Sequence, residues 1–141
     1  MTEPFPALIA TALDTTDPRG LAEFYRQLLG YVYRAGDEVP TDGPDEPRWL
    51  VLTDTGGQPR LAMQRVDRLP TPTWPTGEVA QQLHLDLSVE NVDELHRNRD
   101  RAVALGARLL DDRSADGADP LCVLADPSGH PFCLIAPPVD R

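Results

Sequence analysis

The chain has 141 residues, of which 40% are hydrophobic and 26% are charged, proportions that are ordinary for a soluble globular protein. Its formal net charge of −10 repels phosphate backbones and anionic membranes, so we expect neither a nucleic-acid partner nor a membrane partner. No apolar run approaches the roughly 20 residues of a membrane span, and the first residues lack the pattern of a signal peptide. We therefore expect a cytoplasmic protein.

The first half of the chain predicts a strand, a capped helix and three further strands. Residues 8–14 form a short apolar run that is typical of a buried strand. Asp17 and Pro18 suit the cap and the first position of a helix, and Gly30 suits the position just past its end. The apolar stripe of this helix consists of Leu21, Phe24, Tyr25, Leu28 and Leu29. Strands are expected over residues 31–34, 49–53 and 60–66, with a turn at residues 55–59.

The second half repeats this layout from residue 83 onward. Residues 82–89 alternate, so that Gln82, His84, Asp86 and Ser88 share the face opposite to the leucines. Asn91 and Glu94 resemble a capping box, and the helix that they begin is expected to end at Gly106. Strands are expected over residues 107–111, 121–125 and 132–136, with a turn at residues 126–129.

This order predicts an α+β fold in which two βαβββ modules form a cupped mixed sheet around a cleft. Three strands with hairpin-sized links follow each helix, which argues against a doubly wound sheet. We expect a single domain over residues 1–141, with module one at about 7–66 and module two at about 81–137. The prolines of residues 67–80 predict a stiff linker between the modules.

Three segments carry a resemblance to a known superfamily. They read DPRGLAEFYRQLLGY at residues 17–31, HLDLSVENVDEL at 84–95 and DPSGHPFCLIAP at 126–137. In this order they resemble the helix, the second-module strand and the closing hairpin of vicinal oxygen chelate proteins. That superfamily includes glyoxalase I, extradiol dioxygenases, fosfomycin-resistance enzymes and bleomycin-binding proteins, and the chain is most similar to its glyoxalase-like domain proteins. The resemblance implies the two-module fold, a small-molecule ligand and a homodimer.

The resemblance also implies where a metal would lie. In the family's enzymes four side chains on the concave face hold a divalent metal, and the corresponding positions here are Ala10, Ala62 or Gln64, His84 and Cys133. The sequence leaves the choice between Ala62 and Gln64 open. Alanine cannot ligate, and only His84 offers the imidazole or carboxylate that such sites use. We therefore expect no cofactor; a divalent metal, if one binds, would be held by His84 and Cys133.

The candidate ligand pocket comprises six residues: Trp49, Gln64, Trp74, His84, Asp86 and Cys133. His84 suits a general base or a hydrogen-bond donor, or else it is a solvated histidine. Because strand residues at i and i+2 lie about 6–7 Å apart, we expect His84, Asp86 and Ser88 not to form a catalytic triad. Trp49 is alternatively a core residue, and Trp74 a dimer contact.

The cysteines have their own alternatives. Two thiols in a cytoplasmic chain do not make a disulfide framework, and both Cys122 and Cys133 fall in apolar predicted strands. Buried structural thiols are the simplest interpretation. A reactive or metal-ligating Cys133 is the other.

Three functions compete. The first is a metal-independent protein that binds a small organic molecule, which the missing metal ligands favour. The second is a lyase or isomerase that acts on a small oxygenated substrate, with His84 as base and Cys133 or a metal assisting. The third is an inert structural or interaction module with a filled cleft.

Overall fold

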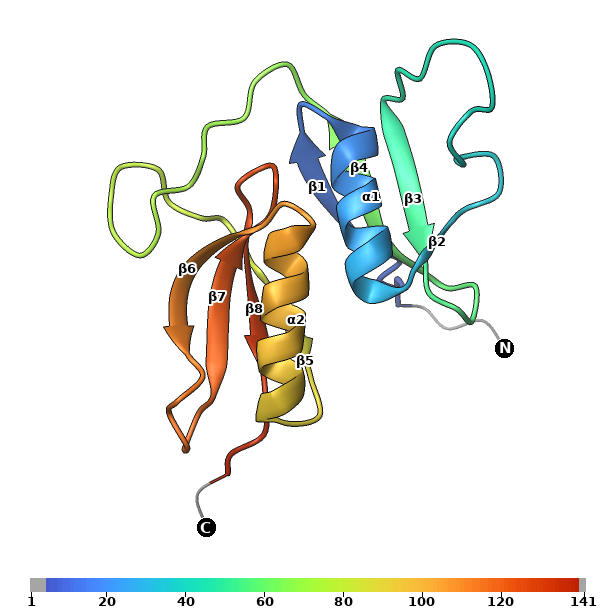
Figure 1. Ribbon diagram of the computed structural model, residues 1–141. Helices are drawn as coiled ribbons and strands as arrows, with labels where there is room; N and C mark the ends of the chain where they lie inside the picture. Colours follow the sequence, from blue (N-terminus) through green and yellow to red (C-terminus); the bar gives the residue numbers. More distant parts are fainter. Residues whose placement is uncertain (1–4, 140–141) are drawn as a thin grey trace. The chain divides into compact units, whose positions relative to one another are not determined.

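The computed structural model describes residues 5–139, which form the two predicted βαβββ modules (Figure 1). The α+β class is confirmed, because the chain has two helices and two four-stranded mixed sheets. The chain divides into two compact units between Asp67 and Arg68, and each unit holds one helix and one sheet. A single domain with a cleft stays a prediction.

Module one consists of a four-stranded sheet and one helix. Its sheet has the order β1-β4-β3-β2, in which β1 runs parallel to β4 and the other neighbours are antiparallel. Helix α1 packs on β3 and β4. The bounds are Thr11–Thr15 for β1, Pro18–Leu29 for α1, Val32–Tyr33 for β2, Trp49–Thr53 for β3 and Pro59–Arg65 for β4.

The predicted caps place helix α1. The Asp17 carboxylate accepts a hydrogen bond of 3.1 Å from the backbone N–H of Gly20, Pro18 occupies the first turn, and Gly30 ends the helix with φ 71°. The predicted stripe faces the sheet: Leu21, Phe24, Tyr25 and Leu28 are buried. Burying each such side chain contributes roughly 1.5–3 kcal/mol, so the stripe, more than intrinsic helix propensity, holds α1 in place.

The expected start of the first strand is wrong. Residues 8–14 were predicted as a buried strand, but Leu8 is 92% exposed and Ile9 is 70% exposed, and β1 begins at Thr11. The neighbouring strand sets this boundary. The pairing between β1 and β4 runs only from Thr11 opposite Leu61 to Thr15 opposite Arg65. Apolar residues that precede this ladder have no strand to pair with in the sheet.

A single arginine at the start of α1 holds the long loop of residues 34–48. Arg19 donates hydrogen bonds to both carboxylate oxygens of Asp45, at 2.8 and 3.0 Å. It also donates to the backbone carbonyls of Asp37, at 2.7 Å, and Glu38, at 3.4 Å. Its guanidinium lies 4.9 Å from the ring centroid of Tyr33. The loop is thereby attached to the first turn of the helix.

Module two has the same plan. Its sheet has the order β5-β8-β7-β6, in which β5 runs parallel to β8 and the other neighbours are antiparallel. The bounds are Leu85–Ser88 for β5, Val92–Ala104 for α2, Arg108–Arg113 for β6, Leu121–Ala125 for β7 and Pro131–Ile135 for β8. Asn91 caps α2 as predicted, accepting a hydrogen bond of 2.8 Å from the N–H of Glu94. Strand β5 is shorter than predicted, so His84 lies directly before it.

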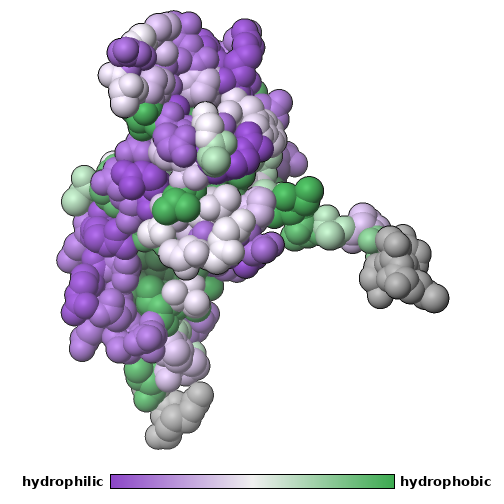
Figure 2. All heavy atoms as spheres, turned by 90° about the vertical axis from the view of Figure 1, so that its right-hand side faces the viewer, coloured by the Kyte–Doolittle hydropathy of each residue, from purple (hydrophilic) through white to green (hydrophobic). Residues whose placement is uncertain are grey.

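Each unit has a core of large buried side chains. In module one they include Tyr25, Leu50, Leu52 and Met63, and in module two Leu95, Cys122, Leu124 and Phe132. On the face of the protein that Figure 2 shows, hydrophilic residues predominate and hydrophobic ones form small groups. Among residues 5–139, no helix is both long enough and apolar enough to cross a membrane.

Candidate functional site

The register of the two sheets shows which residues of the modules are equivalent. Asp86 is opposite Cys133 in the parallel β5–β8 ladder, and Ala12 is opposite Ala62 in the parallel β1–β4 ladder. Asp86 and Ala12 each lie five residues before the cap of the following helix. Ala62 therefore occupies the position equivalent to Cys133. Gln64 lies two residues further along β4, opposite Asp14.

Only module two carries metal-binding side chains at these equivalent positions. His84, Asp86 and Cys133 offer one nitrogen, one oxygen and one sulfur, and these three atoms all lie within 4.8 Å of one another. The equivalent residues of module one are Ala10, Ala12 and Ala62, which have no ligating side chain.

The side chains of His84 and Asp86 lie in contact. Nε2 of His84 lies 3.3 Å from Oδ1 of Asp86. Residues two apart on a strand are spaced by about 6–7 Å along the backbone, and the two side chains span that distance. A carboxylate next to an imidazole favours one orientation of the ring, an arrangement that suits a general base.

Cys133 lies on β8 with a half-buried side chain. Burial, together with the charge of Asp86 and a hydrogen bond with it, raises the pKa of its thiol to about 11. The thiol is therefore protonated at neutral pH. Because the thiolate is the nucleophilic form, this environment favours a structural or ligating role for Cys133 over a nucleophilic one.

A small cavity of about 100 Å³ adjoins this cluster in module two. It is lined by Trp74, Gln81, His84, Val123, Pro131 and Cys133. The amide oxygen of Gln81 is buried, and within residues 5–139 it has no hydrogen-bond partner. The cavity thus has a mainly apolar wall, and one of its lining residues, Gln81, has a buried acceptor.

The structure brings four of the six predicted pocket residues together within module two. Trp74, His84 and Cys133 line the cavity, and Asp86 contacts His84. Trp49 and Gln64 belong to module one, where they are opposite each other on β3 and β4 and are exposed. Sequence analysis missed Gln81, which carries no motif. It also missed Val123, which the turn of the β7–β8 hairpin places opposite Cys133.

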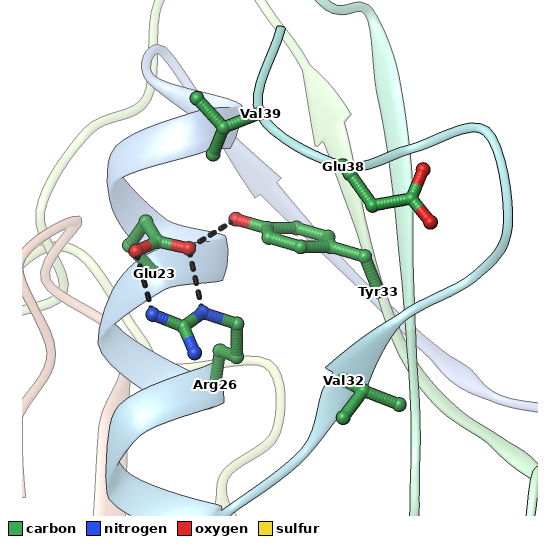
Figure 3. A pocket seen from close by; sticks show the side chains of 6 residues that line it. All are labelled: Glu23, Arg26, Val32, Tyr33, Glu38 and Val39. Carbon is green, nitrogen blue, oxygen red and sulfur yellow. Dashed lines mark hydrogen bonds and ion pairs between the residues drawn. The ribbon is translucent and has the colours of Figure 1, made fainter. Parts of the chain in front are cut away.

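Module one has a separate cavity of about 380 Å³ beside α1 and β2 (Figure 3). Its polar groups bind one another: Glu23 accepts hydrogen bonds of 2.7 Å from Arg26 and from the Tyr33 hydroxyl. Arg26 accordingly holds the pKa of Glu23 below its usual range, and burial raises the pKa of Tyr33 to about 12. The principal polar groups of the module-one cavity are thus already paired. We therefore favour the cavity beside His84 in module two as the functional site.

The comparison with known proteins decides the family. Residues 10–135 match the family model described as "Glyoxalase-like domain". The chain belongs to this family. This match confirms the resemblance to glyoxalase-like domain proteins that the sequence shows. No curated protein matches the sequence.

Several solved structures share the fold at low identity. A glyoxalase/bleomycin resistance protein/dioxygenase family enzyme from Burkholderia phytofirmans PsJN has 17% identity and a TM-score of 0.65, covering 91% of this chain and 96% of that one. A mutant of the fosfomycin resistance protein FosX from Listeria monocytogenes, complexed with Mn(II) and 1S,2S-dihydroxypropylphosphonic acid, has 15% identity and a TM-score of 0.62, with 93% and 92% covered. Lactoylglutathione lyase from Agrobacterium tumefaciens has 19% identity and a TM-score of 0.59, with 95% and 96% covered.

The donor set of this chain does not fit a manganese ion of the kind that FosX holds. Manganese favours carboxylate, carbonyl and water ligands, whereas a thiolate selects softer ions. Here the donors are one imidazole, one carboxylate and one thiol, and Ala10 and Ala62 add none. Metal-assisted chemistry of the manganese type therefore has no support in these residues.

Proposed function

We propose that the protein binds a small organic molecule at the cavity of module two. The observation that carries the proposal is the buried amide oxygen of Gln81, which lacks a partner within residues 5–139 although its side chain lines a cavity. Leaving such a group unsatisfied costs about 1–3 kcal/mol, which a ligand that donates a hydrogen bond would recover. An apolar wall with a few convergent polar groups is typical of ligand sites.

The volume restricts what enters. About 100 Å³ equals the liquid volume of roughly three water molecules, well below the ~300 Å³ at which pockets for drug-sized ligands begin. The cavity therefore admits only one end of a larger ligand, and the acceptor of Gln81 favours an end that carries a hydroxyl or amide donor. Compounds similar to the dihydroxypropylphosphonic acid in the FosX structure are of the right chemical class to try first.

A ligand screen on paired glutamine variants tests this function. Diols, 2-hydroxy acids and hydroxyalkyl phosphonates are screened by ligand-observed NMR, and the affinity of each hit is measured by calorimetry. We expect Gln81→Ala to weaken binding at least about tenfold, or 1.4 kcal/mol. Gln82→Ala, an exposed neighbour, serves as the control. His84→Ala should also weaken binding and leave folding intact, because its side chain is 43% exposed. Hits that bind all variants equally, or a screen without hits, would refute the proposal.

A lyase or isomerase of the glyoxalase-like type is the second candidate. The 3.3 Å contact between His84 and Asp86 favours it, because the carboxylate orients the imidazole as a base. Turnover of a bound compound that Asp86→Asn reduces strongly while the affinity stays unchanged would support this candidate. Turnover that persists in His84→Ala would eliminate it.

Assembly and location complete the proposal. From the family resemblance we expect a homodimer that works in the cytoplasm with a small molecule as its partner. Light scattering on the purified protein measures the assembly: a mass of two chains supports the dimer, and a mass of one chain contradicts it.

A further inference from the structure

We infer that Trp74 limits the size of the ligand end that enters the cavity of module two, so that the site takes an aliphatic end and excludes an aromatic one. The inference rests on the proposed function and narrows its ligand class. It assigns the choice of ligand to a residue of the segment between β4 and β5, which belongs to neither sheet.

The residues that line the cavity come from two sources. Val123 and Cys133 are opposite each other on the antiparallel strands β7 and β8, and Pro131 begins β8, so the sheet fixes these three. Trp74 and Gln81 come from the segment that precedes β5. Because Trp74 has the largest side chain among the lining residues, its indole takes up more of the space around the cavity than any other group.

The loop that carries Trp74 is closed on itself. The backbone N–H of Thr73 donates a hydrogen bond of 2.7 Å to the carbonyl of Val79, and the N–H of Val79 donates one of 2.9 Å to the hydroxyl oxygen of Thr73. This hydroxyl donates in turn to the same carbonyl, at 3.2 Å. A Cβ added to Gly77, whose φ is 136°, would lie 2.2 Å from the hydroxyl oxygen, so the closure needs glycine there.

A second contact holds the loop against module two. The side chain of Thr71 lies against the turn between β7 and β8, where a Cβ added to Gly129 would be 3.0 Å from Cγ2 of Thr71. Trp74 directly follows Thr73 and is therefore held by both the closure and this contact. Because surroundings that are held in place relax only partially when a large side chain is removed, we expect Trp74→Ala to enlarge the cavity.

The volume of the cavity sets the limit. An apolar cavity of roughly 150 Å³ binds a benzene molecule, whereas the cavity beside Trp74 has about 100 Å³. A phenyl group therefore does not fit, but the short carbon chain of an aliphatic alcohol does. An indole is larger than a phenyl ring, so the cavity of Trp74→Ala should have room for one.

Propan-2-ol and phenol test the inference on the full-length chain. Each carries one hydroxyl, and that of phenol is attached directly to the ring, so the ring must enter the cavity for the hydroxyl to reach the buried oxygen of Gln81. Dissociation constants are measured by ligand-observed NMR titration. We expect Trp74→Ala to bind phenol at least about tenfold more tightly than the native chain does, without a comparable gain for propan-2-ol. Trp74→Phe should give an intermediate affinity, and adding Gln81→Ala to Trp74→Ala should reverse the gain.

Thr73→Val and Thr76→Val are the matched pair for the loop. In the Trp74→Ala background, Thr73→Val removes the hydroxyl that closes the loop and should weaken phenol binding, because the loop is then free to fill the space. Thr76→Val, at an exposed threonine of the same loop, should leave phenol binding unchanged. Thermal unfolding checks that each variant is folded.

The outcomes separate this inference from the proposed function. If the native chain binds hydroxyl compounds in a way that depends on Gln81, but Trp74→Ala leaves the affinity for phenol unchanged, the proposed function stands and the inference is overturned. A gain for phenol that persists without the Gln81 amide also overturns the inference, because the phenol then binds elsewhere. If neither the native chain nor Trp74→Ala binds any of these compounds, both are overturned.

Discussion

Asp112 shows how one carboxylate serves several partners in module two. It accepts hydrogen bonds of 2.9 Å from the backbone N–H of Ser114, 3.4 Å from the Cys122 thiol and 2.9 Å from Arg99. The hydrogen bonds from Ser114 are the main cause that lowers the pKa of Asp112 from 3.8 to about 2. Since the charged form is favoured in the folded state, this carboxylate stabilises the fold wherever it is ionised.

The pH dependence of stability follows from this lowered pKa. The contribution of Asp112 is fully present above pH 3.8 and is lost as the pH falls towards 2. Asp112→Asn should therefore lower the free energy of unfolding by about 1 kcal/mol at pH 7, a figure reduced for partial exposure. Measured by urea denaturation, the difference in free energy of unfolding between the variant and the native chain should disappear as the pH falls from 4 to 2. The same difference in free energy of unfolding at pH 7 and pH 2.5 would contradict this account. So would an equal loss of stability in the control variant Asp119→Asn, which changes an exposed carboxylate.

The site was only partly predictable from single residues. His84 and Cys133 were identified because strand parity and the family motifs place them, and Trp74 because a tryptophan in a proline-rich segment suits a pocket mouth. The 3.3 Å contact between His84 and Asp86 was not, because it depends on side-chain conformations, which the residue pattern does not specify. Gln81 has no motif at all, and only its buried amide oxygen reveals it.

At the scale of elements, the first turn of α1 depends on a close approach between two residues. A Cβ added to Gly20 would lie 2.1 Å from Oδ2 of Asp17, the carboxylate that caps the helix. The side chain of Asp17 can rotate away, but the cap is then lost. Glycine at this position thus permits the cap at the expense of helix propensity.

A double-mutant cycle on this turn should reveal the coupling. Alanine in a helix is favoured over glycine by roughly 0.5–1 kcal/mol, and losing an N-cap costs about 1 kcal/mol. Gly20→Ala alone should therefore change stability little, because the two effects offset each other. In the Asp17→Ala background, where no cap remains to lose, the same substitution should stabilise. Thermal unfolding of the four proteins measures the difference, and strictly additive effects would disprove the coupling.

Strand boundaries were predicted best where a strand has a neighbour on each side. Trp49–Thr53 and Leu121–Ala125 were predicted correctly because inner strands are apolar along their whole length. The edge strands β1 and β5 were predicted to begin three residues too early. An edge strand pairs on one side only, so its limits are set by its partner and not by its own apolar residues.

At the scale of the whole molecule, charge decides which partners are repelled. A net charge of −10 acts over the Debye length of about 10 Å at 0.1 M salt and opposes any polyanion. We expect the protein to pass through a heparin column without retention at about 0.05 M salt, and not to sediment with phosphatidylserine vesicles. Retention that falls with increasing salt would show a basic surface that the composition does not predict.

The attachment of residues 34–48 to Arg19 has a consequence for cooperativity. Loops longer than about 12–15 residues without regular structure are uncommon in compact domains, and this one is held by a guanidinium that lies two residues after the cap of α1. If the first turn of the helix frays, the Arg19 side chain moves away with that turn, and the loop loses its hydrogen bonds to the guanidinium. The turn and the loop therefore open as one unit, and their amide protons should exchange with solvent together.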